Sequence, residues 1–406
     1  MSLNKFVERT KNQYFASCPV GLEQLLEKEL KSFGIEDYVT ERGGISFVDK
    51  EYKYLEVLLH SRIASRLFQS LYTATIRHEK DLYKVSNNID WDHLMRMNQT
   101  FKIKTIFSGT KDRGVPIKNS LICSQIFKDG MVDFFNSKYG KRPDVDVKHA
   151  QISLLLHISP DTQDRLLRAH ILVDLGGEPL SNRSYRRGGF EAPLRENLAA
   201  GLVQMMEIDF DKETFVDTMC GSGTVLIEAA MMAHGISPSY FKIKNYPEYT
   251  FAIEQFIPFM MEKENIEVLN KMKAEASKFT LNPKRIVYGF DDSVKSLREC
   301  SDNIFSSGLD SVIKVKKEDA TELKPFQAPH VLFCNPPYAK RMGEEDGLEQ
   351  VYHNYGENLK HEFKGDRAYV FTGNPELAKK ISLRTSKRII LFNGSIECRL
   401  LEYKLF

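Results

Sequence analysis

The stretch Thr214-Phe-Val-Asp217-Thr-Met-Cys220-Gly221-Ser222-Gly223-Thr224 decides the fold of the second half of this chain. Residues Thr214–Thr218 predict a short buried strand, and the apolar residues after Thr224 predict a helix. Between them, two glycines two residues apart allow a tight turn and the close approach of a ligand. The N–H groups and the positive dipole end of the helix would face that ligand. This order of elements predicts a ligand-binding turn of an α/β domain.

The loop is neither a complete dinucleotide fingerprint nor a phosphate-gripping loop. Leu226 stands where the third glycine of the fingerprint would be, and no Lys-Ser/Thr pair follows Gly223. A purely structural turn has the same sequence, so the interpretation depends on the strands around it.

Strands and long helices alternate from about residue 176 onward, which predicts parallel βαβ units. The end differs, because Asn393-Gly394, a strong hairpin signal, joins the last two strands. Residues 236–284 form an insertion that is rich in aromatic residues at first and then helical. The expected strands are Thr214–Thr218, Arg285–Asp291, Val312–Lys316, His330–Cys334, Arg367–Thr372, Arg388–Phe392 and Ser395–Leu405.

Two acids follow the next two strands. Asp291 ends the strand after the glycine loop, where a carboxylate can accept hydrogen bonds from both ribose hydroxyls of a nucleoside. A helix N-cap is the other interpretation, and both can hold at once. Asp319-Ala320 follows the third strand, where the carboxylate could accept from an adenine amino group; a surface loop is the plainer interpretation.

Asn335-Pro336-Pro337-Tyr338 follows an apolar strand and is the sharpest signal in the sequence. The prolines fix the backbone around the flanking Asn and Tyr. The amine of a nucleobase is a poor nucleophile because its lone pair is delocalised. The Asn335 side-chain oxygen and the Pro336 carbonyl would accept its two N–H bonds, and Tyr338 would stack on the base.

The first 165 residues predict small α+β units. Tyr14–Ser17 and the alternating Phe101–Phe107 predict strands, and Leu121 to Phe135 predicts a helix with Ile122 facing inward. Residues 96–150 carry 11 Lys and Arg against 5 Asp and Glu, whereas the whole chain has a net charge of only +2. This local excess indicates a polyanionic partner, although a solvated basic face has the same composition.

Composition excludes several classes of protein. With 42% hydrophobic and 28% charged residues, the 406-residue chain can build sizeable cores. No apolar run approaches the ~20 residues that span a bilayer, and residues 1–12 resemble no signal peptide. The six cysteines form no Cys-x-x-Cys pair, and the ten histidines show no metal-ligand spacing. We therefore expect a cytoplasmic protein with reduced thiols, no membrane partner and no metal.

With these motifs in order, the sequence resembles the class I S-adenosylmethionine-dependent methyltransferases that act on exocyclic amines. More closely, it resembles the bacterial THUMP-domain 23S rRNA guanine-N2 methyltransferases, as a single-domain relative of the N-terminal half of the bifunctional enzymes. The matching segments lie near the start, at the entry to the catalytic domain and at the last hairpin: Cys18 to Leu30, Leu180 to Arg186, Ala192 to Ala200 and Asn393 to Cys398.

The resemblance implies a Rossmann-like methyltransferase domain, with a seven-stranded sheet ending in an antiparallel hairpin, preceded by ferredoxin-like and THUMP modules. The implied domains are 1–55 (ferredoxin-like), 56–165 (THUMP, RNA-binding) and 166–406 (catalytic). The implied cofactor contacts are Asp217, Cys220, Gly221, Ser222, Gly223, Thr224, Asp291, Asp319, Ala320 and Asn335, and the catalytic motif is Asn335, Pro336, Pro337 and Tyr338. The expected RNA contacts are Lys102, Lys104, Lys111, Arg113, Arg183, Arg186 and Arg187, together with Arg195.

Three departures from the family pattern are present. Thr218 replaces a usual Pro, Ser184 replaces a usual Gly, and Ala339-Lys340 replaces a usual Gly-Glu beside the presumed base pocket. The last change puts the target nucleotide in question.

The sequence thus predicts transfer of a methyl group from S-adenosylmethionine to the N2 of a guanosine, in 23S rRNA or a large-subunit assembly intermediate. N6-adenine methylation of RNA or DNA is the alternative, because the Asn-Pro-Pro-Tyr motif suits that amine equally well. A non-catalytic RNA-binding assembly factor is the second alternative.

Overall fold

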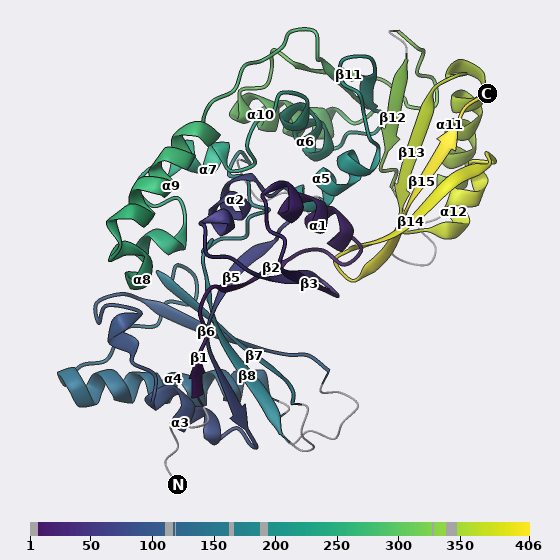
Figure 1. The fold of residues 1–406 in the computed structure, drawn as a ribbon. Helices are drawn as coiled ribbons and strands as arrows, with labels where there is room; N and C mark the ends of the chain where they lie inside the picture. The colour runs from purple at the N-terminus through teal and green to yellow at the C-terminus, as the bar shows by residue number, and fades with distance from the viewer. Residues whose placement is uncertain are drawn as a thin grey trace.

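The computed structural model describes residues 7–109, 117, 119–161, 166–186, 194–326, 329–337 and 347–406. Two β-sheets, each with its own helices, follow one another along the chain (Figure 1). The N-terminal half builds an eight-stranded sheet in the order β3-β4-β2-β5-β8-β7-β6, with β1 paired to β5. Its strands are β1 (Val7–Arg9), β2 (Gln13–Ser17), β3 (Tyr38–Glu41), β4 (Gly44–Val48), β5 (Arg66–Ile76), β6 (Phe101–Phe107), β7 (Ile152–Pro160) and β8 (Leu167–Asp174).

The long strand β5 joins the two halves of this sheet. Its first residues pair with β2, where Ser17 lies opposite Arg66, and most of its length pairs antiparallel with β8. Its burial pattern shows no two-residue alternation, and its pairing with β8 shifts register between Ser70 and Tyr72. Helices α1 (Glu23–Ser32) and α2 (Lys53–His60) belong to the first module. The predicted boundary after residue 55 falls inside α2 and stays a prediction.

The second module packs a long helix against the sheet. Helix α4 (Ser120–Tyr139) contacts α3 (Asp81–Asn87) and β6, and its Phe127 and Phe135 are fully buried. A short 3-10 helix, η2 (Trp91–His93), places Trp91 edge-on to Phe127. The prediction that Ile122 faces inward is wrong: Ile122 is 49% exposed, because it lies in the first turn of α4, ahead of the buried run that begins at Cys123.

The C-terminal half is a seven-stranded sheet in the order β11-β10-β9-β12-β13-β15-β14. Strands β9 to β13 run parallel, and β15 pairs antiparallel with both β13 and β14. The predicted α/β class and closing hairpin are therefore confirmed. The strands are β9 (Thr214–Asp217), β10 (Val287–Asp291), β11 (Ile313–Lys317), β12 (His330–Cys334), β13 (Arg367–Thr372), β14 (Thr385–Asn393) and β15 (Ile396–Lys404).

Helices cover both faces of this sheet (Figure 1). Side chains of α5 (Glu196–Met205) and α6 (Thr224–Ala233) share a core with Phe215 and Phe333, as does Cys300 of α10 (Val294–Ser307). On the other face, α11 (Leu348–Glu362) and α12 (Pro375–Lys380) pack against Val216 and Leu332. The sheet is thus buried between two helical layers, as its apolar parallel strands require.

The predicted insertion forms a bridge between the two halves. It contains α7 (Tyr240–Asn245), the 3-10 helix η3 (Ala252–Gln255), α8 (Ile257–Met260) and α9 (Lys263–Ala276). The Gln255 carbonyl accepts a hydrogen bond from Gln99 Nε2 at 2.7 Å, and its side-chain oxygen accepts one from Gln151 Nε2 at 2.8 Å. The Ile253 N–H donates to the Leu175 carbonyl at 2.9 Å. These contacts hold the N-terminal sheet against the C-terminal half.

Candidate active site

The glycine loop follows β9 and opens α6, as the sequence predicts. Gly221 has φ +55° and Gly223 has φ +80°, a region that non-glycine residues rarely adopt. A Cβ on Gly221 would meet nothing within 4 Å, whereas a Cβ on Gly223 would lie 2.5 Å from the sulfur of Cys300. Gly221 is therefore open to a ligand, and Gly223 is needed for packing against α10.

Backbone hydrogen bonds tie this loop to the strands on either side. The Thr218 N–H donates to the Phe333 carbonyl of β12 at 2.8 Å. The Cys220 N–H donates to the Phe290 carbonyl of β10, also at 2.8 Å. The loop is thus built into the carboxyl edge of the sheet, at the strand where the chain order reverses. Open α/β sheets bind their ligands at such a switch point.

Asp291 lies where β10 ends and contacts the loop directly. Its Oδ2 accepts a hydrogen bond from the Gly221 N–H at 2.9 Å, and its Oδ1 accepts one from the Ser293 N–H at 3.0 Å. The N-cap of α10 is the neighbouring Ser293, whose hydroxyl accepts from the Ser296 N–H. One carboxylate therefore connects the glycine loop to the start of α10.

Asp217, at the end of β9, is fully enclosed beneath the loop. The pKa of its carboxyl is raised to about 8, mainly by burial. The charge of the nearby Asp291 also raises this pKa, and the hydrogen bond from the Met219 N–H opposes the rise. Since an isolated buried charge is costly, the carboxyl is held mainly in its neutral form near neutral pH.

The remaining loop side chains are fixed by their neighbours. A hydrogen bond with Cys300, together with burial, raises the pKa of the Cys220 thiol, so it stays neutral. The Ser222 carbonyl accepts a hydrogen bond from Asn303 Nδ2 at 3.0 Å, and the Ser222 and Thr224 hydroxyls lie 3.4 Å apart. These contacts pre-organise the loop.

Asp319 and Ala320 lie just beyond β11, beside the Asp291 end of β10. The Glu318 N–H donates to the Asp291 carbonyl at 3.2 Å, which joins the two strand ends. Asp319 Oδ1 accepts from both the N–H and the hydroxyl of Thr321, each at 2.8 Å, and Ala320 is buried. The structure thus brings both predicted acids to the same edge of the sheet as the glycine loop.

Asn335 follows β12 at this edge. Its side-chain oxygen is buried, and among the described residues it has no hydrogen-bond donor. Pro336 is buried and Pro337 is exposed. A buried acceptor without a donor is unfavourable by about 1–3 kcal/mol, so a ligand that donates a hydrogen bond to Asn335 would be favoured. Tyr338 lies outside the described residues.

Two tyrosines of α11, absent from the sequence prediction, hold these motifs in place. The Tyr352 hydroxyl donates to the Pro337 carbonyl at 3.3 Å. The Tyr355 hydroxyl accepts from the Thr218 hydroxyl at 3.0 Å. Their three-residue spacing puts both tyrosines on one face of the helix. This spacing is the feature of the sequence that could have indicated their role.

The predicted RNA-contacting arginines lie in different environments. Arg183 is 1% exposed, and its guanidinium donates to Glu228 Oε1 at 2.9 Å and to the Leu180 and Arg62 carbonyls. The prediction that Arg183 contacts RNA is therefore wrong: its donors are directed into the protein core. Arg186 donates hydrogen bonds to Glu196 at 2.6 Å and to the Thr224 hydroxyl at 2.7 Å. It therefore stabilises the end of the glycine loop where α6 begins.

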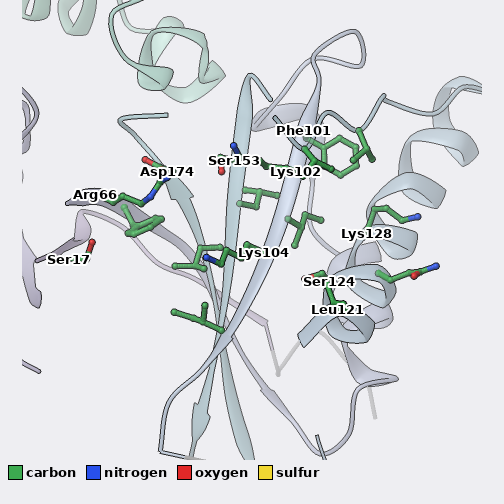
Figure 2. A pocket seen from close by; sticks show the side chains of 18 of the residues that line it. Ser17, Arg66, Phe101, Lys102, Lys104, Leu121, Ser124, Lys128, Ser153 and Asp174 are labelled. Atoms are coloured by element: carbon green, nitrogen blue, oxygen red, sulfur yellow. The ribbon is translucent and has the colours of Figure 1, made fainter. Parts of the chain in front are cut away.

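Two predicted lysines of β6 line a cavity of about 780 Å³ between the N-terminal sheet and α4 (Figure 2). Lys102 and Lys104 lie on its sheet side, and Lys128 extends from α4 on the other. Arg195 is exposed at the start of α5. Lys111, Arg113 and Arg187 lie outside the described residues.

Comparison with known families agrees with this architecture. Residues 183–402 match the RMKL-like, methyltransferase domain, more than half of the chain. The chain belongs to the RMKL-like methyltransferase-domain family. Residues 13–68 match the RlmL ferredoxin-like domain and residues 77–162 match the THUMP domain.

Individual relatives of this RMKL-like chain match nearly its whole length. It is 31% identical over 401 residues to the ribosomal RNA large subunit methyltransferase K/L of Syntrophotalea carbinolica, covering 97% of this chain and 53% of that protein. With the protein of the same name from Cellvibrio japonicus, the identity is 32% over 409 residues, covering 97% and 51%. The chain thus spans about half the length of the curated relatives it matches.

The fold is also seen in a solved structure. The crystal structure of SMU.472 in complex with SAH superposes with a TM-score of 0.79 at 24% identity, covering 98% of this chain and 99% of that one. Among the residues described here, no helix is long and apolar enough to cross a membrane. In the same part of the chain, no group of three or more His, Cys, Asp or Glu residues could hold a metal ion.

Proposed function

We propose that this chain transfers a methyl group from S-adenosylmethionine to the exocyclic N2 of a guanosine in 23S rRNA, by direct in-line displacement. The buried, unpartnered side-chain oxygen of Asn335 carries the proposal. The amino group of a nucleobase supplies the N–H donor that this oxygen lacks.

The residues at the switch point fit the proposed methyl donor. The open Gly221 leaves room for a ligand against the loop backbone. Asp291 would accept from ribose hydroxyls, and Asp319 with Ala320 would border the adenine. The other loop residues, Asp217, Cys220, Ser222, Gly223 and Thr224, would shape the site around the donor. When bound, S-adenosylmethionine supplies an electrophilic methyl group.

Positioning is the main contribution of the protein. The Asn335 side-chain oxygen and the Pro336 carbonyl would accept the two amine N–H bonds and so direct the nitrogen lone pair at the methyl carbon. Tyr338 would stack on the base. Well-oriented groups react with effective molarities of ~10⁵ M or more, so orientation alone can supply much of the acceleration.

RNA is the proposed partner, bound in part by the basic face of the N-terminal sheet. The family relationship to large-subunit rRNA methyltransferases and the THUMP match support this choice. Lys102, Lys104, Lys111, Arg113 and Arg187 are the proposed phosphate contacts, together with the exposed Arg195. Arg186 is not among these proposed phosphate contacts. Its proposed role is to stabilise the glycine loop through its hydrogen bond to the Thr224 hydroxyl.

The test is methyl transfer from labelled S-adenosylmethionine to ribosomal RNA from cells that lack this protein, with mass spectrometry of the digested nucleosides. We expect N2-methylguanosine, which disappears with Asn335→Ala and persists with Asn354→Ala, an exposed asparagine of α11. N6-methyladenosine would contradict the substrate. Cofactor binding without transfer to naked rRNA or assembly intermediates would contradict the reaction.

A further inference from the structure

A cleft of about 520 Å³ opens where the N-terminal sheet, the linker to the catalytic half and the insertion meet. Residues 148–151 lead into β7 on one side, residues 176–184 form the linker, and residues 242–255 of the insertion form the third wall. Asn245 Nδ2 donates to the Ser184 carbonyl at 2.9 Å, and the Gln151–Gln255 hydrogen bond joins the other two walls. These bonds hold the walls in place.

Two exposed tyrosines line this cleft. Tyr246 is 57% exposed and Tyr249 is 60% exposed, and they follow α7 within four residues of each other. Exposed aromatic rings beside a groove are the platforms on which single-stranded RNA stacks its bases, because every base has a π-face. Neither ring is buried in the protein core, so packing does not explain an aromatic residue at these two positions.

The charge of the cleft suits a phosphate backbone. Lys102, Lys148 and Lys242 line it, and Glu178 is the single acidic residue among the described residues that line it. Lys242 is 7% exposed, and its ammonium lies 3.4 Å from the Gly176 carbonyl. Among the described residues, no carboxylate forms a salt bridge with this ammonium. Burial lowers the pKa of Lys242 to about 8, and the charges of Asp174 and Glu178 raise it, so Lys242 is a buried and partly balanced charge in the wall of the cleft.

The cleft is connected to the candidate active site by a short segment. Ser184 lines the cleft, and two residues later Arg186 donates to the Thr224 hydroxyl at the start of α6. Two extended residues span at most about 7 Å of backbone, and the Arg186 side chain extends from there to Thr224, so one short segment of chain links the cleft to the start of α6.

We propose that this cleft binds the single-stranded RNA that flanks the target nucleotide, with Tyr246 and Tyr249 stacking on its bases and Lys148 contacting its phosphates. The proposal rests on the proposed RNA substrate. It assigns to the insertion a role in substrate binding besides its role as a bridge.

The test measures binding of a fluorescein-labelled single-stranded RNA oligonucleotide by anisotropy. Tyr246→Ala and Tyr249→Ala should each weaken binding about 5-fold or more, as expected for loss of one base-stacking contact. Tyr246→Phe and Tyr249→Phe should restore it, because the ring remains. Phe305→Ala is the matched control, since Phe305 is a 72% exposed aromatic residue of α10 outside the cleft.

Two further measurements separate this inference from the proposed function. Lys148→Gln should reduce the dependence of log affinity on log salt by about one. S-adenosylhomocysteine binding should stay unchanged in every variant. Unchanged RNA affinity in both Tyr→Ala variants would overturn the cleft as an RNA site, even if the wild-type enzyme makes N2-methylguanosine. Failure of wild-type methylation, with tyrosine-dependent RNA binding, would contradict only the proposed reaction.

Discussion

The N–H of Gly221 and the carboxylate of Asp291 are joined by a 2.9 Å hydrogen bond. The two residues lie 70 positions apart, and the insertion separates them along the chain. The bond fixes Gly221, where a Cβ would meet no atom within 4 Å, against the strand end that the sequence predicts for ribose recognition. The fold therefore brings together two residues that the insertion separates along the chain.

Asp291→Ala should weaken S-adenosylmethionine binding by about 10-fold or more, because it removes both the proposed ribose acceptor and the support of Gly221. Hydrogen bonds to charged groups contribute about 1.5–3 kcal/mol. Isothermal titration calorimetry with S-adenosylhomocysteine checks this. Asp292→Ala, at the exposed neighbouring position, is the control. Equal affinities for the two variants would exclude Asp291 from the cofactor site.

Gly223→Ala should destabilise the fold more than Gly235→Ala. Both glycines have positive φ, but only the Gly223 Cβ would collide with Cys300 Sγ, at 2.5 Å. The shared backbone strain cancels in the comparison, and overpacking of about 1–3 kcal/mol remains. Urea denaturation measures the difference. Cys300→Ala in the Gly223→Ala background should recover part of the loss; no recovery would contradict this contact as the cause.

Arg183→Met should lower the free energy of unfolding by about 3–5 kcal/mol, because it leaves Glu228 buried without its cation. Adding Glu228→Gln should restore much of that stability. The salt dependence of RNA binding should stay unchanged in the double variant. A reduced salt slope in the refolded double variant would indicate that Arg183 contacts phosphate after all.

Asp217 gives a pH dependence of stability. Burial raises its pKa to about 8, so the folded state holds a proton that the unfolded state has lost above pH 4. Its contribution is therefore largest at low pH and is lost as the pH rises toward 8. Relative to Asp217→Asn, the wild type should lose up to about 1.4 kcal/mol per pH unit between pH 5 and 8. Urea titrations at several pH values check this, and parallel curves would contradict it.

Lys102→Gln and Lys104→Gln should each reduce the salt slope of RNA binding by about one. Both lysines line the cavity in Figure 2, on the side of β6. Affinity for S-adenosylhomocysteine should not change, because the proposed cofactor site lies at the C-terminal sheet and these lysines lie on the N-terminal sheet. Lys316→Gln, on β11 of the catalytic sheet, is the control. If the control lowers the slope equally, the basic face of β6 has no special role.

The catalytic half follows the sequence prediction closely, because its parallel strands are buried on both faces and separated by clear turn signals. Strand β13 begins and ends where it was predicted, and β12 does as well. The closing hairpin is a local property of the chain, but its two-residue turn is Gly394-Ser395, one residue later than predicted, because Asn393 still pairs with Ile396.

Other features depend on contacts between distant residues. No strand was predicted at Arg66–Ile76, because its register shift and three-way pairing remove the two-residue alternation. Arg183 was assigned to RNA because nothing local shows that Glu228, 45 residues later, faces it. The unpartnered oxygen of Asn335 is likewise a property of its surroundings, whereas its motif is visible in the sequence.

Strand β5 has a consequence for how this molecule can be divided. The ferredoxin-like match ends at residue 68 and the THUMP match begins at residue 77, whereas β5 spans Arg66–Ile76, so it begins inside the first match and ends just before the second. A cut after residue 68 splits β5, and a cut before residue 77 takes from β8 the strand that it pairs with. The two matched regions are therefore poor candidates for separate expression or exchange between homologues. Evolutionary shuffling of either one would have had to carry this strand with it.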